Sequence, residues 1–517
     1  PKPSSAASDV YKRQMLKNAL LISFAFIGTV VGAGFASGQE AMLYFSAFGT
    51  QGLWGAVLGS ALMLIAGVTI LQLGSFFQAK EHMEVLGSIS SKVMGWILDI
   101  ATIVTLFSIG FVMFAGAGAN LNQQFGIPVW IGAVLMLAAT IGFGMLDVDK
   151  VTGAIGALTP FLLIFVIFGC GWTLINSHPD WEALNAAAAQ VDTSLPNWWI
   201  SALNYTGLNV MCVVSMALVI GGNQLDTRAA GLGGLFGGIG YLVMLMLLAM
   251  ALLVKIDTVE GQDMPLLALI SDINPTMGLI MSLVIFGMIF ATCLGMFFAL
   301  GKRLSRGRED KFRIIFISAC LIGFVLSFVG FQQLVSTVYP ILGYLGLLLI
   351  VVMTLAWIRG IPKLRKEGDR RRRALELTRK KMDPAERFTK NDERELEYLT
   401  AKSNVDEEEL VEALEEEVAQ ELLDDEESEF EEEDIDNPSD VVYVSYTDPV
   451  SADEYAANPD EPWNDRTVDD MIAAEEAEEA AGPDNSLGGD ANDEEDAVEE
   501  TGGSTAVSAK GTGSTKL

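Results

Sequence analysis

The residues with the most informative spacing lie in the first apolar segment, between Gly28 and Glu40. Four glycines fall within eleven residues there. A glycine inside a helix costs about 1 kcal/mol relative to alanine, so this run is expected to unwind the helix locally. At membrane depth, unpaired backbone groups are tolerated only where they line a cavity or bind something. The run therefore predicts a broken helix at a binding site.

The two ends of this break would carry opposite partial charges. The second half-helix would begin near Gly34, and its free N–H groups suit a carboxylate or another anion. The carbonyls that end the first half-helix, near Gly28 and Val31, suit a cation. Glycines can also serve only to let helices pack closely. The polar residues Gln39 and Glu40 that follow favour a binding site over packing alone.

Gln39 and Glu40 have their own expected role. If the helix continued beyond the break, Glu40 would lie about 12 Å beyond Gly32, at about 1.5 Å per residue. That distance places it in an outer vestibule. We assign Gln39 and Glu40 to a gate or to the recruitment of cations.

A second interruption is expected in the sixth apolar segment. Interrupted helices at corresponding positions of two inverted halves indicate a substrate site near the middle of the membrane. The interruption is indicated by polar and breakable residues in an otherwise apolar run: Asn204, Thr206, Gly207 and Asn209.

The eighth segment offers a small hydroxyl at Thr292. This hydroxyl would complete a cation site with the carbonyls of the first break. A hydrogen bond from Thr292 to its own helix backbone is an equally good interpretation of the residue alone.

These residues require long apolar elements to position them. About 20 apolar residues span a bilayer, and a buried helix set in a soluble protein would not repeat this length in series. An odd number of spans in each half inverts the second half relative to the first, so the sequence predicts an all-α polytopic membrane protein built as a 5+5 inverted repeat. We expect about ten spans, near residues 16–46, 53–77, 93–118, 128–146, 152–176, 198–221, 230–254, 276–300, 313–330 and 334–357.

The charges divide the chain into a basic body and an acidic tail. Up to Lys381 there are 26 basic and 20 acidic residues, a balance of +6, whereas the remainder carries 7 basic and 46 acidic residues, a balance of −39. Lysine and arginine are retained on the cytoplasmic side of a membrane. Their distribution among the loops predicts that both termini are cytoplasmic, and Lys255 is the exception in an outer loop.

The expected organisation follows from these boundaries. Residues 1–14 are polar and lack the core of a signal peptide, so we expect a non-native leader before Met15. The other segments are a first repeat at 15–176, an extracellular loop at 177–197, a second repeat at 198–358, a polybasic segment at 359–381, a charged helical segment at 382–425 and a disordered acidic tail at 426–517.

The polybasic segment has two interpretations. It would contact anionic lipid, or it would serve only to anchor the topology. The tail that follows is a candidate for capture of a cytosolic partner.

The stretch from Gly28 to Glu40 resembles the first-helix motif of the uncharacterised YkvI-type bacterial membrane proteins. That family is grouped with the amino acid–polyamine–organocation transporters. The resemblance covers about residues 15–357 and excludes the tail. It implies a LeuT-type fold with broken helices one and six, substrate at both breaks, and a sodium ion between helices one and eight.

The resemblance also assigns individual residues. It implies that Gly28, Val31 and Thr292 hold sodium. In some proton-coupled relatives a lysine on helix five takes the place of the sodium ion. Here Lys150 stands only at the start of that helix, too shallow to reach the ion site, so sodium is favoured as the coupling ion and a proton is not excluded. The substrate residues that it implies are Gly32, Ala33 and Gly34, with Thr206, Gly207 and Asn209 as a looser match.

We therefore expect an ion-coupled secondary transporter of a small amino-acid-like solute, working by alternating access. The alternative is a membrane sensor or scaffold that recruits cytosolic partners through the tail. The sequence has no catalytic constellation within its spans, four scattered cysteines and two separate histidines. An enzyme, a cofactor, a metal centre other than a sodium site, and nucleic-acid binding are therefore not expected.

Overall fold

The computed structural model describes residues 3–80, 82–89, 92–145, 158–305, 308–383 and 388–424. The chain divides into two compact units, with the boundary between Gly368 and Asp369. Every element described is an α-helix or a short 3-10 helix. The predicted all-α class is thus confirmed.

The membrane-spanning segments lie where hydropathy predicts them. Eight helical stretches of the described residues are long and apolar enough to cross a bilayer, and the helices Met15–Val30 and Val129–Gly144 are shorter and apolar. The helices of the first half are α1 (Pro3–Val30), α2 (Ala33–Ser37), α3 (Gln39–Tyr44), η1 (Ser46–Phe48), α4 (Gly49–Phe77), α5 (His82–Ile89), α6 (Lys92–Phe125), α7 (Val129–Gly144) and α9 (Leu158–Asn176). Those that follow are α10 (Trp181–Ala188), α11 (Trp198–Gly222), α12 (Thr227–Val254), α13 (Ile256–Val259), α14 (Pro265–Ile273), α15 (Pro275–Ser305), α16 (Glu309–Leu326), η2 (Ser327–Val329) and α17 (Phe331–Met382).

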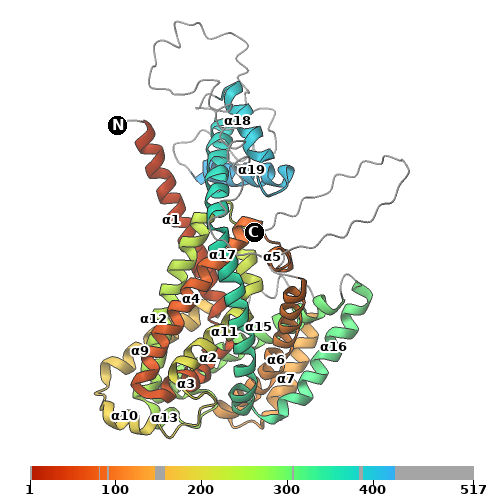
Figure 1. Cartoon of the computed structure of the whole chain (residues 1–517). Helices are drawn as coiled ribbons and strands as arrows, with labels where there is room; N and C mark the ends of the chain where they lie inside the picture. Colours follow the sequence, from red (N-terminus) through yellow and green to blue (C-terminus); the bar gives the residue numbers. More distant parts are fainter. Residues whose placement is uncertain are drawn as a thin grey trace, which may run out of the picture. The chain divides into compact units, whose positions relative to one another are not determined.

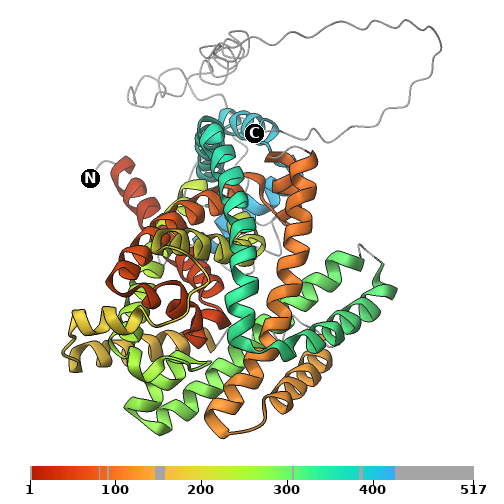
Figure 2. The same ribbon diagram turned by 60° about the horizontal axis from the view of Figure 1, so that its bottom comes forward.

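The first unit contains two groups of helices. In one group, α4 packs against α11 and α12, and α1 packs against α12 (Figure 1). In the other, α6 packs against α7, α15 and α16, which appear as neighbouring orange and green ribbons in Figure 2. Each group takes two consecutive spans from each half of the chain. This pairing is the one that a 5+5 repeat requires.

Small residues allow the first group to pack closely. Gly234 of α12 faces the backbone of Gly67 in α4, and Gly238 faces Leu64 one turn away. A methyl group added at either glycine would meet backbone atoms of α4 within 3.0 Å. Because association in lipid depends on close packing rather than on the hydrophobic effect, such glycines stabilise the bundle directly.

The first span is broken, as predicted. The helix α1 ends at Val30, and α2 begins at Ala33. A second interruption follows at Gly38, which adopts φ +78° between α2 and α3. Residues with side chains rarely adopt this conformation, so glycine is required there.

The sixth span differs from the prediction, because α11 runs without a break from Trp198 to Gly222. The reason is that its polar groups are satisfied inside or beside the helix. The Asn209 amide donates to the carbonyl of Tyr205 at 2.9 Å. The Thr206 hydroxyl lies 3.0 Å from the carbonyl of Ala202 and 3.0 Å from that of Gly59. Polar residues therefore do not unwind this helix.

The second unit is a small charged assembly. It comprises the end of α17 from Asp369 onward with α18 (Lys390–Ala401) and α19 (Glu407–Asp424). A capping box of Thr389 and Asp392 starts α18. Buried Leu422 packs with Leu375 of α17 in a small apolar cluster. The predicted acidic tail at 426–517 lies outside the described residues.

Ion pairs join the three helices of this unit. Arg373 binds Glu395 through two contacts of 2.8 and 3.1 Å. Burial acts to lower the pKa of Arg373, but the hydrogen bond and charge of Glu395 outweigh it and raise the pKa above its ordinary value. Lys380 binds Asp392 at 2.7 Å, and Arg379 binds Glu421 at 2.9 Å. Three basic side chains of the predicted polybasic segment are thus paired with the acidic helices that follow it.

Candidate functional site

The candidate site is the break between α1 and α2. At the end of α1, the N–H of Val31 donates to the carbonyl of Ile27 at 2.8 Å, and the N–H of Gly32 turns back to the carbonyl of Val30 at 3.0 Å. Among the described residues, the carbonyls of Gly28 and Val31 receive no hydrogen bond. These two oxygens are therefore free to bind a ligand, as the glycine spacing predicts.

Thr292 faces this break from α15. A methyl group built on Gly32 would lie 3.9 Å from the Thr292 hydroxyl oxygen. That hydroxyl makes no hydrogen bond with any residue that the structure describes. The interpretation in which Thr292 bonds its own helix is therefore not what the structure contains. Thr292, predicted to complete a cation site with the carbonyls of Gly28 and Val31, thus lies beside Gly32.

A threonine that the sequence reasoning missed also lies at the break. Thr159 of α9 approaches Gly28, at 3.9 Å from a methyl group built on that glycine. No sequence motif marks Thr159; only its position along the fifth span would indicate that it can reach the break. Lys150, the lysine of this span that bears on proton coupling, lies outside the described residues.

On the far side of the break, Glu40 occupies a different place from the predicted vestibule. Its carboxylate lies directly over Gly34, where an added methyl group would overlap it. The side chain is buried, with 8% of its surface exposed. The turn at Gly38 accounts for this difference, because it interrupts the helix between Gly34 and Glu40, so that Glu40 does not continue the line of one straight helix.

Three further backbone and side-chain groups at this end lack partners. The N–H groups of Ala33 and Gly34 find no acceptor among the described residues. Gln39 is buried, and neither its amide nitrogen nor its amide oxygen has a hydrogen-bond partner there. Polar groups without a partner are thus concentrated in one short stretch of chain, which contains the predicted residues Ala33, Gly34, Gln39 and Glu40.

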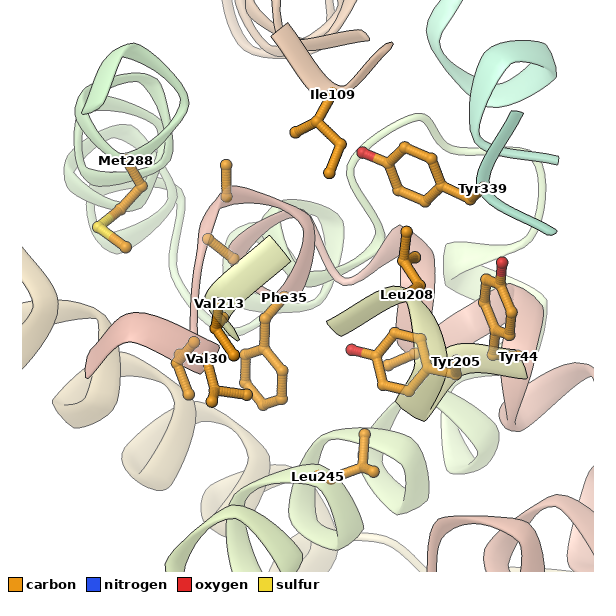
Figure 3. Packing of buried hydrophobic residues seen from close by; sticks show 14 of the residues in the cluster. Val30, Phe35, Tyr44, Ile109, Tyr205, Leu208, Val213, Leu245, Met288 and Tyr339 are labelled. Atoms are coloured by element: carbon orange, nitrogen blue, oxygen red, sulfur yellow. The ribbon is translucent and has the colours of Figure 1, made fainter. Parts of the chain in front are cut away.

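Aromatic side chains surround the broken helix. Figure 3 shows Phe35 beside Val30, and Tyr44, Tyr205 and Tyr339 together on the other side. The rings of Tyr44 and Tyr205 have centroids 5.1 Å apart. These three tyrosines come from α3, α11 and α17, and each is at most 3% exposed. The site is therefore enclosed by residues from both halves of the chain.

The residues predicted in helix six are placed unevenly. Thr206 points at Gly59 of α4. Gly207 packs against the backbone of Gly343 in α17. Neither contact faces the break, whereas Asn209 is next to Tyr205. The predicted set is therefore divided between the site and the helix interfaces.

Asn204 is the residue of this stretch that joins separate elements. Its oxygen lies 3.4 Å from the Tyr44 hydroxyl, which donates to it, and its amide nitrogen donates to the carbonyl of Pro340 at 2.8 Å. It is fully buried. Asn204 therefore ties α11 to both α3 and α17 beside the site.

A narrow cavity adjoins Tyr44. Its volume is about 10 Å³, room for about one water molecule. It is lined by side chains of α3, of the segment before α11, and of α17: Leu43, Tyr44, Ser194, Leu195, Val335, Ser336 and Pro340. This cavity has no room for anything larger than a water molecule in this conformation.

The chain is similar to two uncharacterized bacterial proteins. The chain is 27% identical over 340 residues to the uncharacterized membrane protein YkvI of Bacillus subtilis (strain 168), covering 64% of this chain and 94% of that protein. The predicted resemblance to YkvI-type proteins is confirmed. A second protein similar to this chain, uncharacterized protein YyaD of the same organism, is 26% identical over 330 residues, with the same coverage of 64% and 94%. No family model matches the chain.

Solved structures are also similar to this chain, at low identity. MhsT in complex with L-phenylalanine has 13% identity and a TM-score of 0.47, covering 76% of this chain and 98% of that one. The Eremococcus coleocola manganese transporter has 14% identity and a TM-score of 0.42, with coverage of 79% and 92%. Mhp1 in an inward-facing conformation has 11% identity and a TM-score of 0.41, with coverage of 65% and 74%.

Proposed function

We propose that this chain is a secondary transporter of a small amino-acid-like solute, coupled to sodium and working by alternating access. The proposal rests chiefly on one observation: unpaired carbonyls of Gly28 and Val31 end a broken helix beside Thr292 of another half. Discontinuous helices with free carbonyls at mid-membrane bind coupling ions in transporters. Sodium at this position would be held by three oxygens that the fold leaves otherwise unused.

The solute would bind next to the ion. The free N–H groups of Ala33 and Gly34, the tyrosines and Asn209 bound this space, and the buried side chains of Gln39 and Glu40 lie at the same end of the break. Because the two groups of helices meet at the break, movement of one group against the other would expose it to either side. We place the chain in the bacterial plasma membrane with both termini in the cytoplasm, in agreement with the distribution of lysine and arginine.

The proposal is tested by the thermal stability of the purified full chain. A panel of the proteinogenic amino acids would be tested in sodium chloride and in choline chloride. A ligand at 100 times its dissociation constant stabilises by about 2.7 kcal/mol, which a melting curve detects. We expect at least one solute to raise the melting temperature in sodium and to lose most of that effect in choline. The absence of any shift in either salt would contradict the proposal.

The second candidate is a membrane scaffold that acts through its tail. The compact charged unit from Asp369 onward favours it, because a folded segment offers a defined surface to a partner. Under this alternative, function would reside beyond Gly368 and not at the break.

A further inference from the structure

Glu40 has no counter-charge. Its carboxylate lies over Gly34, and no lysine, arginine or histidine that the structure describes forms an ion pair with it. Neutral aromatic residues from three elements, Tyr44 of α3, Tyr205 of α11 and Tyr339 of α17, lie together beside the broken helix (Figure 3). Burial of an unpaired carboxylate is costly, so this site requires a positive partner or a proton.

The groups around Glu40 are suited to a cation. The side chains of Tyr205 and Tyr241 are buried, each 1% exposed. The rings of Tyr44 and Tyr205 pack together with their centroids 5.1 Å apart, beside the broken helix (Figure 3). Aromatic rings and a carboxylate together form a recognised environment for ammonium groups. An anionic ligand would be repelled by the charge of Glu40.

We propose that Glu40 binds the ammonium group of the transported solute, so that the substrates are primary amines and amino acids rather than simple carboxylates. This inference rests on the proposed function and narrows its substrate class. A zwitterion would place its ammonium on Glu40. Its carboxylate would lie away from Gly34, since Glu40 already occupies the space above that glycine.

The test compares three forms of each solute on the full chain. Each amino acid is paired with the amine that lacks its carboxylate and with the acid that lacks its amino group, for example leucine, 3-methylbutylamine and 4-methylpentanoate. We expect amines and amino acids to raise the melting temperature, and the acids to leave it unchanged. This comparison uses the unaltered chain and does not depend on the folding of any variant.

Variants then locate the effect. Glu40→Gln should weaken binding of the amine by about a hundredfold, because a buried charge would lose its partner. Glu40→Asp should bind more weakly than the natural chain but better than Glu40→Gln. Gly34→Ala keeps the carboxylate but displaces it, and should also weaken binding. Glu260→Gln, at an exposed carboxylate, is the matched control and should change nothing.

Two results would overturn this inference. The first is stabilisation by the acids and not by the amines; if that stabilisation needs sodium, the transporter proposal survives and the assignment of Glu40 fails. The second is stabilisation by an amine that is unchanged in a folded Glu40→Gln variant. No stabilisation by any of the three forms in either salt would contradict both proposals together.

Discussion

The ion pair between Asp99 of α6 and Arg303 of α15 joins the third and eighth spans. Both side chains are largely buried, 11% and 12% exposed, and the guanidinium Nε lies 2.9 Å from the carboxylate. Removing one partner of a buried pair leaves an uncompensated charge and costs about 3–5 kcal/mol. We expect Asp99→Asn to lower the melting temperature markedly.

The pair of Lys255 and Asp272 is the matched control for this prediction. Its side chains are 37% and 44% exposed, with the ammonium 2.9 Å from the carboxylate. Exposed pairs contribute about 0–1 kcal/mol. Asp272→Asn should therefore leave the melting temperature almost unchanged. Equal losses in Asp99→Asn and Asp272→Asn would show that burial does not govern these pairs.

Glu40 shows what residue spacing can and cannot predict at this scale. The glycine run predicts the break and the free carbonyls of Gly28 and Val31. The predicted distance of about 12 Å between Gly32 and Glu40 does not hold, because it assumes that one straight helix continues beyond Gly32. A single glycine at position 38 with positive φ changes the path of the chain, and composition alone does not distinguish such a turn from a packing glycine.

At the scale of elements, Gly207 tests how α11 and α17 are held together. A methyl group at Gly207 would overlap the carbonyl of Gly343, and one at Gly346 would overlap the carbonyl of Gly207. Backbone atoms cannot rotate away, so Gly207→Ala should destabilise the chain by about 1–3 kcal/mol. The measurement is the melting temperature of the purified variant.

Gly142 of α7 provides the comparison, because nothing lies within 4 Å of an added methyl group there. Gly142→Ala should be neutral or stabilise by up to about 1 kcal/mol, since alanine favours helix. A Gly207→Ala variant as stable as Gly142→Ala would mean that α11 and α17 are not in close contact.

The sixth span explains why an interrupted helix is harder to predict than a spanning one. A span is read from about 20 apolar residues, and the structure places helices at these positions. Whether a polar stretch unwinds depends on its partners. Thr206 and Asn209 find acceptors on α4 and on their own helix. The partner of Thr206 on α4 comes from distant sequence, and the bonds within the helix are not evident from composition, so the polar stretch alone predicts a break that the structure does not contain.

At the scale of the whole chain, the two units separate the two candidate functions. We expect a chain ending at Gly368 to keep the stabilisation by solute and sodium, because every residue of the proposed site precedes that boundary. The measurement is the same melting experiment on the shortened chain. Loss of solute binding from a shortened chain that still folds would instead support a function that depends on the charged unit.

The central claim is coupled transport through the break beside Thr292, and flux measures it most directly. The full chain in proteoliposomes would be given a radiolabelled solute that stabilises it, with an inward gradient of sodium or of choline. We predict that the solute accumulates when the gradient is of sodium. In Thr292→Val the affinity for sodium should be about tenfold weaker, equivalent to about 1.4 kcal/mol. In Thr292→Ser, which keeps the hydroxyl, the affinity for sodium should be partly recovered. Thr173→Val, which removes a hydroxyl bonded to its own helix, should transport normally. Accumulation that is equal in sodium and choline, or no accumulation at all, would contradict the account.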